Sequence, residues 1–150
     1  MSDEQPTITA DEFRARLASL CLKTGQPGMP RKRRDQHIIL KSAVLTLDPE
    51  TTYDETELGD ALQQWQRTVG RELLVDHVSM RRHLVDDGYL ERDPEGTAYR
   101  VAPTAPDLFE PDVKTLDPGE IVTTAELERI EKKLQYMADR TADQKLESGE

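Results

Sequence analysis

The chain has 150 residues, of which 35% are hydrophobic and 33% are charged, with a formal net charge of -10. This length is typical of one domain, and so few hydrophobic residues can form one core only if part of the chain lies outside it. No apolar run approaches the ~18 to 20 residues of a membrane span, and the N-terminus lacks the basic and apolar regions of a secretory signal. The sequence therefore predicts a cytoplasmic protein without a membrane partner.

The acidic charge is unevenly distributed along the chain. Residues 102–150 carry 6 basic and 12 acidic groups, for a net charge of -6, whereas residues 31–101 carry 11 basic and 14 acidic groups. The middle segment also contains the one dense basic run, Arg31-Lys32-Arg33-Arg34. An anionic partner such as nucleic acid would meet the protein at this run.

Residues 1–30 predict a short helix followed by a linker. Thr9 and Glu12 have the spacing of a capping box. Apolar residues then recur on one side of a helix over 9–22, at Phe13, Leu17, Leu20 and Cys21. Gly25, Pro27, Gly28 and Pro30 mark the end of this segment.

Residues 31–101 predict three helices and a β-hairpin. The helices are expected from about Arg34 to Leu45, from Asp54 onwards, and from Asp76 to Gly88, with the two aspartates as N-caps. The hairpin turn is Asp93-Pro94-Glu95-Gly96. The order of helix, short strand, helix, helix and hairpin predicts a winged helix-turn-helix core. The expected fold is mostly α with a small β-hairpin and has helical extensions at both ends.

The apolar spacing also predicts which side of each helix is buried. The second helix has an apolar stripe at Leu58, Ala61, Leu62 and Trp65, and the third has one at Val78, Met80, Leu84 and Val85. The opposite side of the third helix carries Ser79, Arg82, His83 and Asp86. Arg81 falls within the apolar stripe, so we expect it to pair with a buried or half-buried carboxylate.

The C-terminal third predicts an extended linker and a last helix. Residues 102–122 contain four prolines and are expected to be extended, with apolar side chains that can pack on the domain, namely Leu108, Phe109, Val113, Leu116 and Ile121. In residues 123–150, Thr123 and Glu126 predict a capping box, and the tail from about Thr141 is expected to fray. An a/d seam of Leu127, Ile130, Leu134 and Met137 either folds back on the domain or pairs with a second chain, and analogy with other winged-helix regulators favours the homodimer.

Two stretches resemble a known bacterial family. They are MPRKRRD at 29–35 and DHVSMRRHLVDDGYLER at 76–92, with Tyr53 between them. Their order and separation resemble the family named domain of unknown function 2087 over residues 29–101. The resemblance implies a winged-helix-like domain, which in some members is fused behind an ArsR-type regulator domain, and it implies no established activity.

The candidate nucleic-acid-binding residues are Arg31, Lys32, Arg33 and Arg34 in the basic run and Ser79, Arg82 and His83 on the third helix. The alternative is that the basic residues pair with acidic residues of the same chain. Catalysis finds little support, because the three histidines lack metal-binding spacing, Cys21 lies on an apolar face, and no nucleotide-binding or nucleophile motif is present. We expect no metal and no cofactor.

Two hypotheses of function follow from these observations. The first is a non-enzymatic regulator of transcription that binds double-stranded DNA through the third helix and the basic run. The second is a protein-protein interaction module in which the winged helix is a scaffold and the acidic C-terminal region is the contact surface. A positive stripe shared by the basic run and Arg82 would favour the first hypothesis, and a neutral or acidic face would favour the second.

Overall fold

Helices account for most of the described chain. The computed structural model describes residues 7–22, 28–103 and 106–148, with side chains described as far as Gln144. In chain order the elements are α1 (Ala10–Leu22), α2 (Arg33–Val44), β1 (Tyr53–Asp54), α3 (Glu55–Thr68), α4 (His77–Asp86), β2 (Leu90–Arg92), β3 (Ala98–Val101), the 3-10 helix η1 (Pro111–Thr115) and α5 (Pro118–Ser148). The prediction of a mostly α fold with a small β-hairpin is confirmed.

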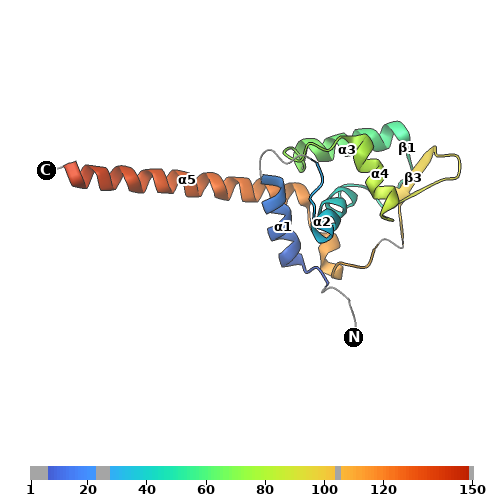
Figure 1. The fold of residues 1–150 in the computed structure, drawn as a ribbon, viewed down its shortest axis with the longest axis horizontal. Helices are drawn as coiled ribbons and strands as arrows, with labels where there is room; N and C mark the ends of the chain where they lie inside the picture. The colour runs from blue at the N-terminus through green and yellow to red at the C-terminus, as the bar shows by residue number, and fades with distance from the viewer. Residues whose placement is uncertain (1–6, 23–27, 104–105, 149–150) are drawn as a thin grey trace.

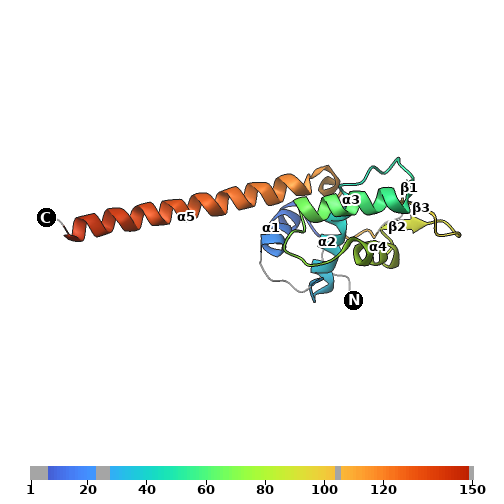
Figure 2. The same cartoon turned by 90° about the horizontal axis from the view of Figure 1, so that it is seen from above.

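The elements divide into a packed body and one projecting helix. Figure 1 shows α1 to α4 and the strands gathered in the body, and α5 leaving it as a long helix that ends at the C-terminus. The view from above in Figure 2 shows the same projection, so it does not depend on the direction of view. We call the described residues between 7 and 122 the body and residues 130–148 the free part of α5.

The caps predicted for α3 and α4 are present. The Asp54 carboxylate accepts a hydrogen bond from Glu57 N at 2.7 Å, and the Glu57 carboxylate accepts one from Asp54 N at 2.9 Å, which completes a capping box. Asp76 accepts a hydrogen bond from Ser79 N at 2.7 Å and so caps α4. Beyond α4, Gly88 has a φ of +82°, a left-handed conformation that favours glycine after a helix. Local sequence therefore determines these boundaries.

The predicted hairpin is part of a three-stranded antiparallel sheet in the order β1-β3-β2. The short strand before α3 joins it, with Tyr53 opposite Tyr99. In the turn, the Asp93 carboxylate accepts hydrogen bonds from Ala98 N at 3.0 Å and Thr97 N at 2.6 Å. These bonds favour the ionised form and lower the pKa of Asp93 to about 2.

The buried stripe of α3 is confirmed. Leu58, Leu62 and Trp65 are fully buried, and Ala61 is half-buried. The indole Nε1 of Trp65 donates a hydrogen bond to Ser42 Oγ of α2 at 2.9 Å, so the polar atom of this large side chain is satisfied inside the core.

The buried stripe of α4 was predicted wrongly at Val78, which is 46% exposed. Met80 and Leu84 are buried and Val85 is half-buried, as expected. The buried residues Met80 and Leu84 define the inward side of α4. At about 100° per residue, Val78 lies roughly 160° from Met80 and roughly 120° from Leu84 around the helix, so its side chain points outward.

The described residues of the predicted extended linker, 102–103 and 106–122, pack more closely on the body than expected. Ile8 N donates to Leu108 O at 2.7 Å, and Glu110 N donates to Ile8 O at 2.9 Å, so the start of the chain forms a bridge with this segment. Phe109 and Val113 are buried, and the other predicted apolar residues are half-buried, namely Leu108, Leu116 and Ile121.

The predicted start of the last helix at Thr123 is wrong. Asp117 accepts a hydrogen bond from Gly119 N at 3.0 Å and acts as the N-cap, and Pro118 takes the first helical position, which suits proline because it needs no N–H donor there. Thr123 and Glu126 lie inside the helix. The helix continues to Ser148, past the expected fraying point at Thr141.

The first helix matches its prediction except at the cap. Its apolar side chains are buried, namely Phe13, Leu17, Leu20 and Cys21. Thr9 Oγ1 accepts a hydrogen bond from Glu12 N at 3.0 Å, but the Glu12 carboxylate bonds to Arg34 and leaves the capping box half-formed. Gly25 and Pro27 lie outside the described residues. None of the helices in the described part of the chain is both long and apolar enough to cross a membrane.

Candidate interaction surfaces

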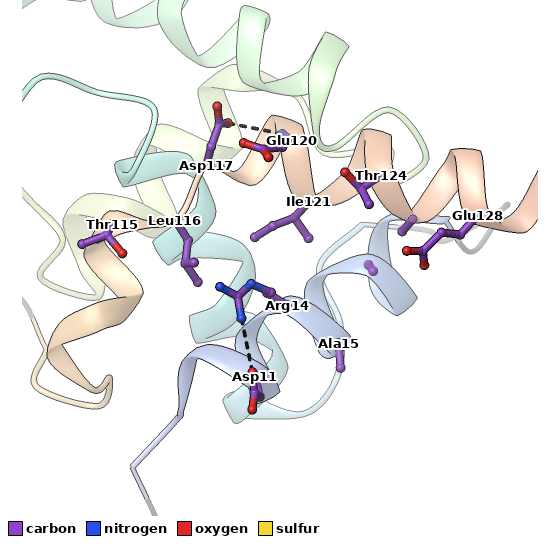
Figure 3. A pocket seen from close by; sticks show the side chains of 12 residues that line it. Asp11, Arg14, Ala15, Thr115, Leu116, Asp117, Glu120, Ile121, Thr124 and Glu128 are labelled. Atoms are coloured by element: carbon purple, nitrogen blue, oxygen red, sulfur yellow. Dashed lines mark hydrogen bonds and ion pairs between the residues drawn. The ribbon is translucent and has the colours of Figure 1, made fainter.

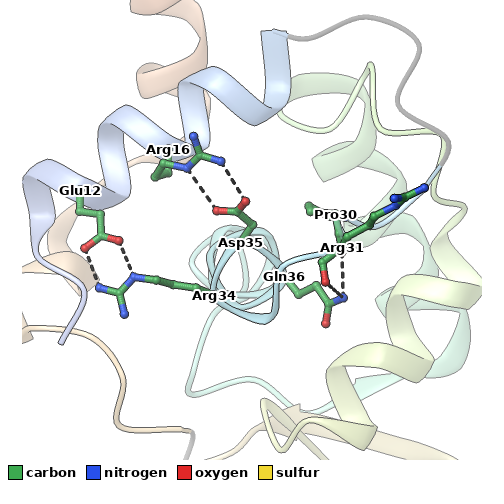
Figure 4. Close-up of polar contacts among 7 residues, drawn as sticks. All are labelled: Glu12, Arg16, Pro30, Arg31, Arg34, Asp35 and Gln36. Atoms are coloured by element: carbon green, nitrogen blue, oxygen red, sulfur yellow. Dashed lines mark hydrogen bonds and ion pairs between the residues drawn. The ribbon is translucent and has the colours of Figure 1, made fainter. Parts of the chain in front are cut away.

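The basic run at 31–34 divides into two paired and two unpaired side chains. Arg33 Nη2 lies 2.6 Å from Asp87 Oδ1 at the end of α4, and Arg34 Nε lies 2.6 Å from Glu12 Oε2 of α1. Arg31 and Lys32 are exposed, and neither side chain forms an ion pair within the described residues. Figure 4 shows Arg31 and Arg34 pointing in opposite directions. The run is therefore not one continuous basic surface.

Ion pairs between α1 and α2 explain where part of this charge goes. Arg16 donates to both oxygens of Asp35, at 3.2 and 2.9 Å, and Asp35 is only 7% exposed (Figure 4). The hydrogen bond from Arg34 lowers the pKa of Glu12 below its ordinary value. The sequence analysis missed the roles of Glu12, Arg16 and Asp35, because partners on different helices leave no local signal.

The outward side of α4 carries Arg82 and Asp86, both exposed, while Ser79 and His83 are half-buried. Arg82 forms no ion pair in the part of the chain that the structure describes. Of the predicted nucleic-acid-binding residues, Arg31, Lys32 and Arg82 therefore have exposed and uncommitted charges. Of the others, Arg33 and Arg34 are held in ion pairs, and Ser79 and His83 are half-buried.

Arg81 pairs with a carboxylate as expected, although this carboxylate is more exposed than predicted. Arg81 Nη1 lies 3.1 Å from Glu55 Oε1 at the start of α3, and its guanidinium carbon lies 5.7 Å from the ring centroid of Tyr99. Glu55 is exposed rather than buried or half-buried, so that detail of the prediction is wrong.

The hairpin adds charges of both signs beside α4. Arg100 lies 3.5 Å from Glu91 on the opposite strand, as expected for cross-strand surface residues. The outward side of α4 and the hairpin together carry the basic residues Arg82, Arg92 and Arg100 and the acidic residues Asp86, Glu91, Asp93 and Glu95. This face has no excess of positive charge to attract phosphate.

The histidines and the cysteine make local contacts inside the body. The His37 Nδ1 and Tyr89 Oη atoms are 2.7 Å apart, and burial lowers the pKa of His37. Burial also raises the pKa of the Cys21 thiol to about 12, so this thiol stays protonated and unreactive. Within the described residues, no cluster of three or more His, Cys, Asp or Glu side chains is arranged to hold a metal ion.

The seam of α5 is uncovered along its whole length. Leu127, Ile130, Leu134 and Met137 are 48–61% exposed. Every residue from 127 to 144 is exposed, so the seam does not fold back on the body. The core is instead completed by the first turns of α5, where Val122 is buried and Ile121 is half-buried.

An open groove of about 600 Å³ lies between α1 and the start of α5 (Figure 3). Its apolar lining comes from Ala15, Ala18, Leu116, Ile121 and Ala125, and charged residues at its rim include Asp11, Arg14 and Glu128. Arg14 pairs with Asp11 at 3.2 Å. No buried side-chain nitrogen or oxygen of the described residues lacks a hydrogen-bond partner, so the groove offers no orphaned polar group to a ligand.

Comparison with known proteins gives one match. Residues 27–101 fit a family described as "Uncharacterized protein conserved in bacteria (DUF2087)". No curated protein and no solved structure matches the chain. The matched residues include α2, α3, α4 and all three strands, together with both stretches on which the resemblance was based. The chain is therefore a member of the DUF2087 family.

Proposed function

We propose that this protein is a protein-protein interaction module whose body is a scaffold and whose helix α5 carries the contact surface. The observation that supports this function best is the continuous exposure of α5 over residues 127–144, with an apolar seam at Leu127, Ile130, Leu134 and Met137. Contiguous apolar surface on a protein of low hydrophobic content is typical of an interaction site.

The charges of the body support the same proposal. Arg33 and Arg34 are committed to Asp87 and Glu12, and the face formed by α4 and the hairpin has no positive excess. A neutral or acidic face is the outcome that favours an interaction module over a DNA-binding regulator. The acidic C-terminal third would also repel phosphate.

A comparison of two charge-matched variants tests this function. Ile130→Glu with Leu134→Glu places two carboxylates on the seam, whereas Gln135→Glu with Ala142→Glu places two on other sides of α5. Each immobilised protein is exposed to nuclease-treated lysate, and the retained proteins are identified by mass spectrometry. We expect the wild type and the control to retain the same proteins, including any second copy of this chain, and the seam variant to lose them. Equal retention by all three would overturn the proposal.

We propose DNA binding as a second candidate function. The order of α2, β1, α3, α4 and the hairpin is that expected of a winged helix-turn-helix, and Arg31, Lys32 and Arg82 are exposed and unpaired within the described residues. In this case Arg31 and Lys32 contact phosphates and Arg82 contacts base edges, while Ser79 and His83 lie near Arg82 on α4.

Anisotropy titrations with duplex DNA at several salt concentrations test the second candidate. Each phosphate contact contributes about -0.9 to the slope of log K against log salt. Arg31→Ala with Lys32→Ala should flatten this slope, and Arg82→Ala should reduce discrimination between sequences. Removal of residues 123–150 should tighten binding, because it removes acidic charge. If neither the full-length protein nor the form without residues 123–150 binds DNA at low salt, the second candidate function is wrong.

A further inference from the structure

Most of the apolar seam of α5 lies beyond the contacts that attach this helix to the body. At the start of the helix Val122 is buried, Glu126 pairs with Arg71, and Arg129 Nη1 donates to Leu22 O at 3.1 Å. At about 100° per residue, Leu127 and Leu134 lie roughly 120–140° from Val122 around the helix axis, and Ile130 and Met137 lie roughly 60–80° from it. The seam is therefore turned to one side of the attached face, and it stays uncovered because α5 projects from the body (Figure 1).

The free part of α5 is long enough to need support. Residues 130–148 span roughly 28 Å at 1.5 Å per residue. An isolated helix of this length is marginal in water, and its stability normally comes from an apolar side packed on something else. The apolar positions of the seam end at Met137, after which Thr141 and Gln144 take the same positions. The surface that covers the seam must therefore be short and apolar.

We infer that this surface is the same seam of a second copy, and that the two α5 helices pair antiparallel. This inference rests on the proposed function and names its partner. In antiparallel coiled coils, a positions face d positions of the other helix. With Leu127 against Met137 of the second copy and Ile130 against Leu134 of the second copy, every apolar seam residue meets another.

The charges beside the seam favour this direction. In the antiparallel register Glu126, whose carboxylate also pairs with Arg71 of its own body, lies opposite Arg140 of the second copy, and two-fold symmetry repeats this attraction. Lys133 and Glu131 each face their own symmetry mates at the centre, so the register also contains like-charge contacts. In the parallel register Glu126 lies opposite Glu131 of the second copy, this repulsion is repeated by symmetry, and Lys133 faces the uncharged Ala138. Opposite charges beside a seam set the orientation of coiled-coil partners.

The seam is also suited to a reversible dimer. Four apolar residues form about two heptads, which is short for a coiled coil. The association should therefore depend on protein concentration. An antiparallel pair places the two bodies at opposite ends of the paired helices.

Sedimentation equilibrium of the full chain over a wide range of concentrations tests for the second copy. The mean mass should rise from 17.1 kDa towards twice that value. Ile130→Glu with Leu134→Glu should stay monomeric, and Gln135→Glu with Ala142→Glu should associate like the wild type. All of these positions are exposed, so matching circular dichroism melts would show that the body still folds. A wild type that remains monomeric throughout would overturn the inference.

Crosslinking with a short bifunctional thiol reagent tests the direction. Cys21 is buried and its thiol pKa is raised to about 12, so it gives a quiet background. In the antiparallel pair, Leu127→Cys mixed with Met137→Cys should give a crosslinked dimer, and either variant alone should give none, since like positions lie roughly 15 Å apart along the axis. Crosslinking of each variant with itself would show a parallel pair and overturn the orientation.

These outcomes separate the inference from the function on which it rests. If the chain is monomeric but the wild type still retains other proteins that the seam variant loses, the pairing with a second copy is wrong and the proposed interaction function stands. If the chain is monomeric and the seam variant retains the same proteins as the wild type, both the pairing and the proposed function are wrong.

Discussion

The body and the free part of α5 have the same kind of sequence pattern and opposite surroundings. In α3, apolar residues at helical spacing, such as Leu58 and Leu62, are fully buried, whereas in the free part of α5 Ile130 and Leu134 at the same spacing are exposed. Periodicity shows that a helix has an apolar side, but it does not identify what covers that side. In the body the covering surface is another part of the chain, and along α5 it is another molecule according to our inference.

The largest expected difference between the two regions concerns aromatic side chains. Trp65→Ala removes a buried indole and its hydrogen bond to Ser42, and should lower the free energy of unfolding by ~3 to 5 kcal/mol. Tyr136→Ala removes an exposed ring of α5 and should change the free energy of unfolding by less than ~0.5 kcal/mol. Urea unfolding of both variants measures this difference. Similar losses would contradict the division into body and free helix.

The ion pairs of the body should differ according to burial. Arg16→Ala leaves the Asp35 carboxylate, which is nearly buried, without its guanidinium partner and should cost ~1 to 3 kcal/mol. Arg14→Ala removes a pair with Asp11, whose side chain is 97% exposed, and should have almost no effect. Both arginines are on α1. Equal losses in urea unfolding would contradict the expectation that the pair between α1 and α2 contributes more to stability than the exposed pair within α1.

Adjacent arginines on α4 give a smaller contrast. Arg81→Ala removes a half-buried side chain that pairs with Glu55 and packs near Tyr99, and should cost ~1 kcal/mol. Arg82→Ala removes an exposed side chain and should stay within ~0.5 kcal/mol of the wild type. If Arg82→Ala lost more stability than Arg81→Ala in thermal or urea unfolding, the assignment of Arg81 to the half-buried side of α4 and of Arg82 to the exposed side would be wrong.

The pH dependence of stability should report His37. Burial lowers its folded-state pKa below 6.5, whereas the unfolded chain keeps the ordinary value, so the unfolded state binds more protons just below pH 6.5. Stability should therefore fall as the pH drops below 6.5 and continue to fall until the folded-state pKa is reached. Urea titrations of the wild type and His37→Gln should show a smaller fall in the variant. A His37 pKa above 6.5 by NMR would contradict the sign.

A small effect is expected from the deletion of the free part of α5. Removing residues 130–150 takes away the free part of α5, and every described side chain in it, from Ile130 to Gln144, is exposed. At a concentration where the protein is monomeric, the free energy of unfolding of the body should change by less than ~0.5 kcal/mol. A large loss measured by urea unfolding would mean that the free part of α5 supports the body.

Much of the body followed from the sequence because its signals are local. The caps at Asp54 and Asp76, the turn at Asp93, and the stripe that ends at Trp65 each depend on residues within a few positions of one another. The errors arose where two local signals compete. The Thr123 cap had the right residues, but Asp117 and Pro118 start the same helix earlier, and a capping signal inside a continuous helix has no free N–H to satisfy.

The candidate site was predicted less well, because charge on a sequence does not indicate a partner. The basic run suggested one anion-binding surface, but Arg33 and Arg34 bond to Asp87 and Glu12, which lie 54 and 22 residues away along the chain. Only folding brings such groups together, and the predicted alternative of pairing within the chain is confirmed for these two arginines.

By itself, the sequence determined the mostly α fold, the start of α3, both ends of α4, the hairpin, and the family, because these depend on propensity, capping and motif spacing over short distances. The tertiary structure decided which charges remain uncommitted and which apolar side remains uncovered. Both are properties of pairs of surfaces: a guanidinium is neutralised, or a leucine is buried, only when the fold places another part of the chain within contact distance. For the seam of α5 it places none among the described residues.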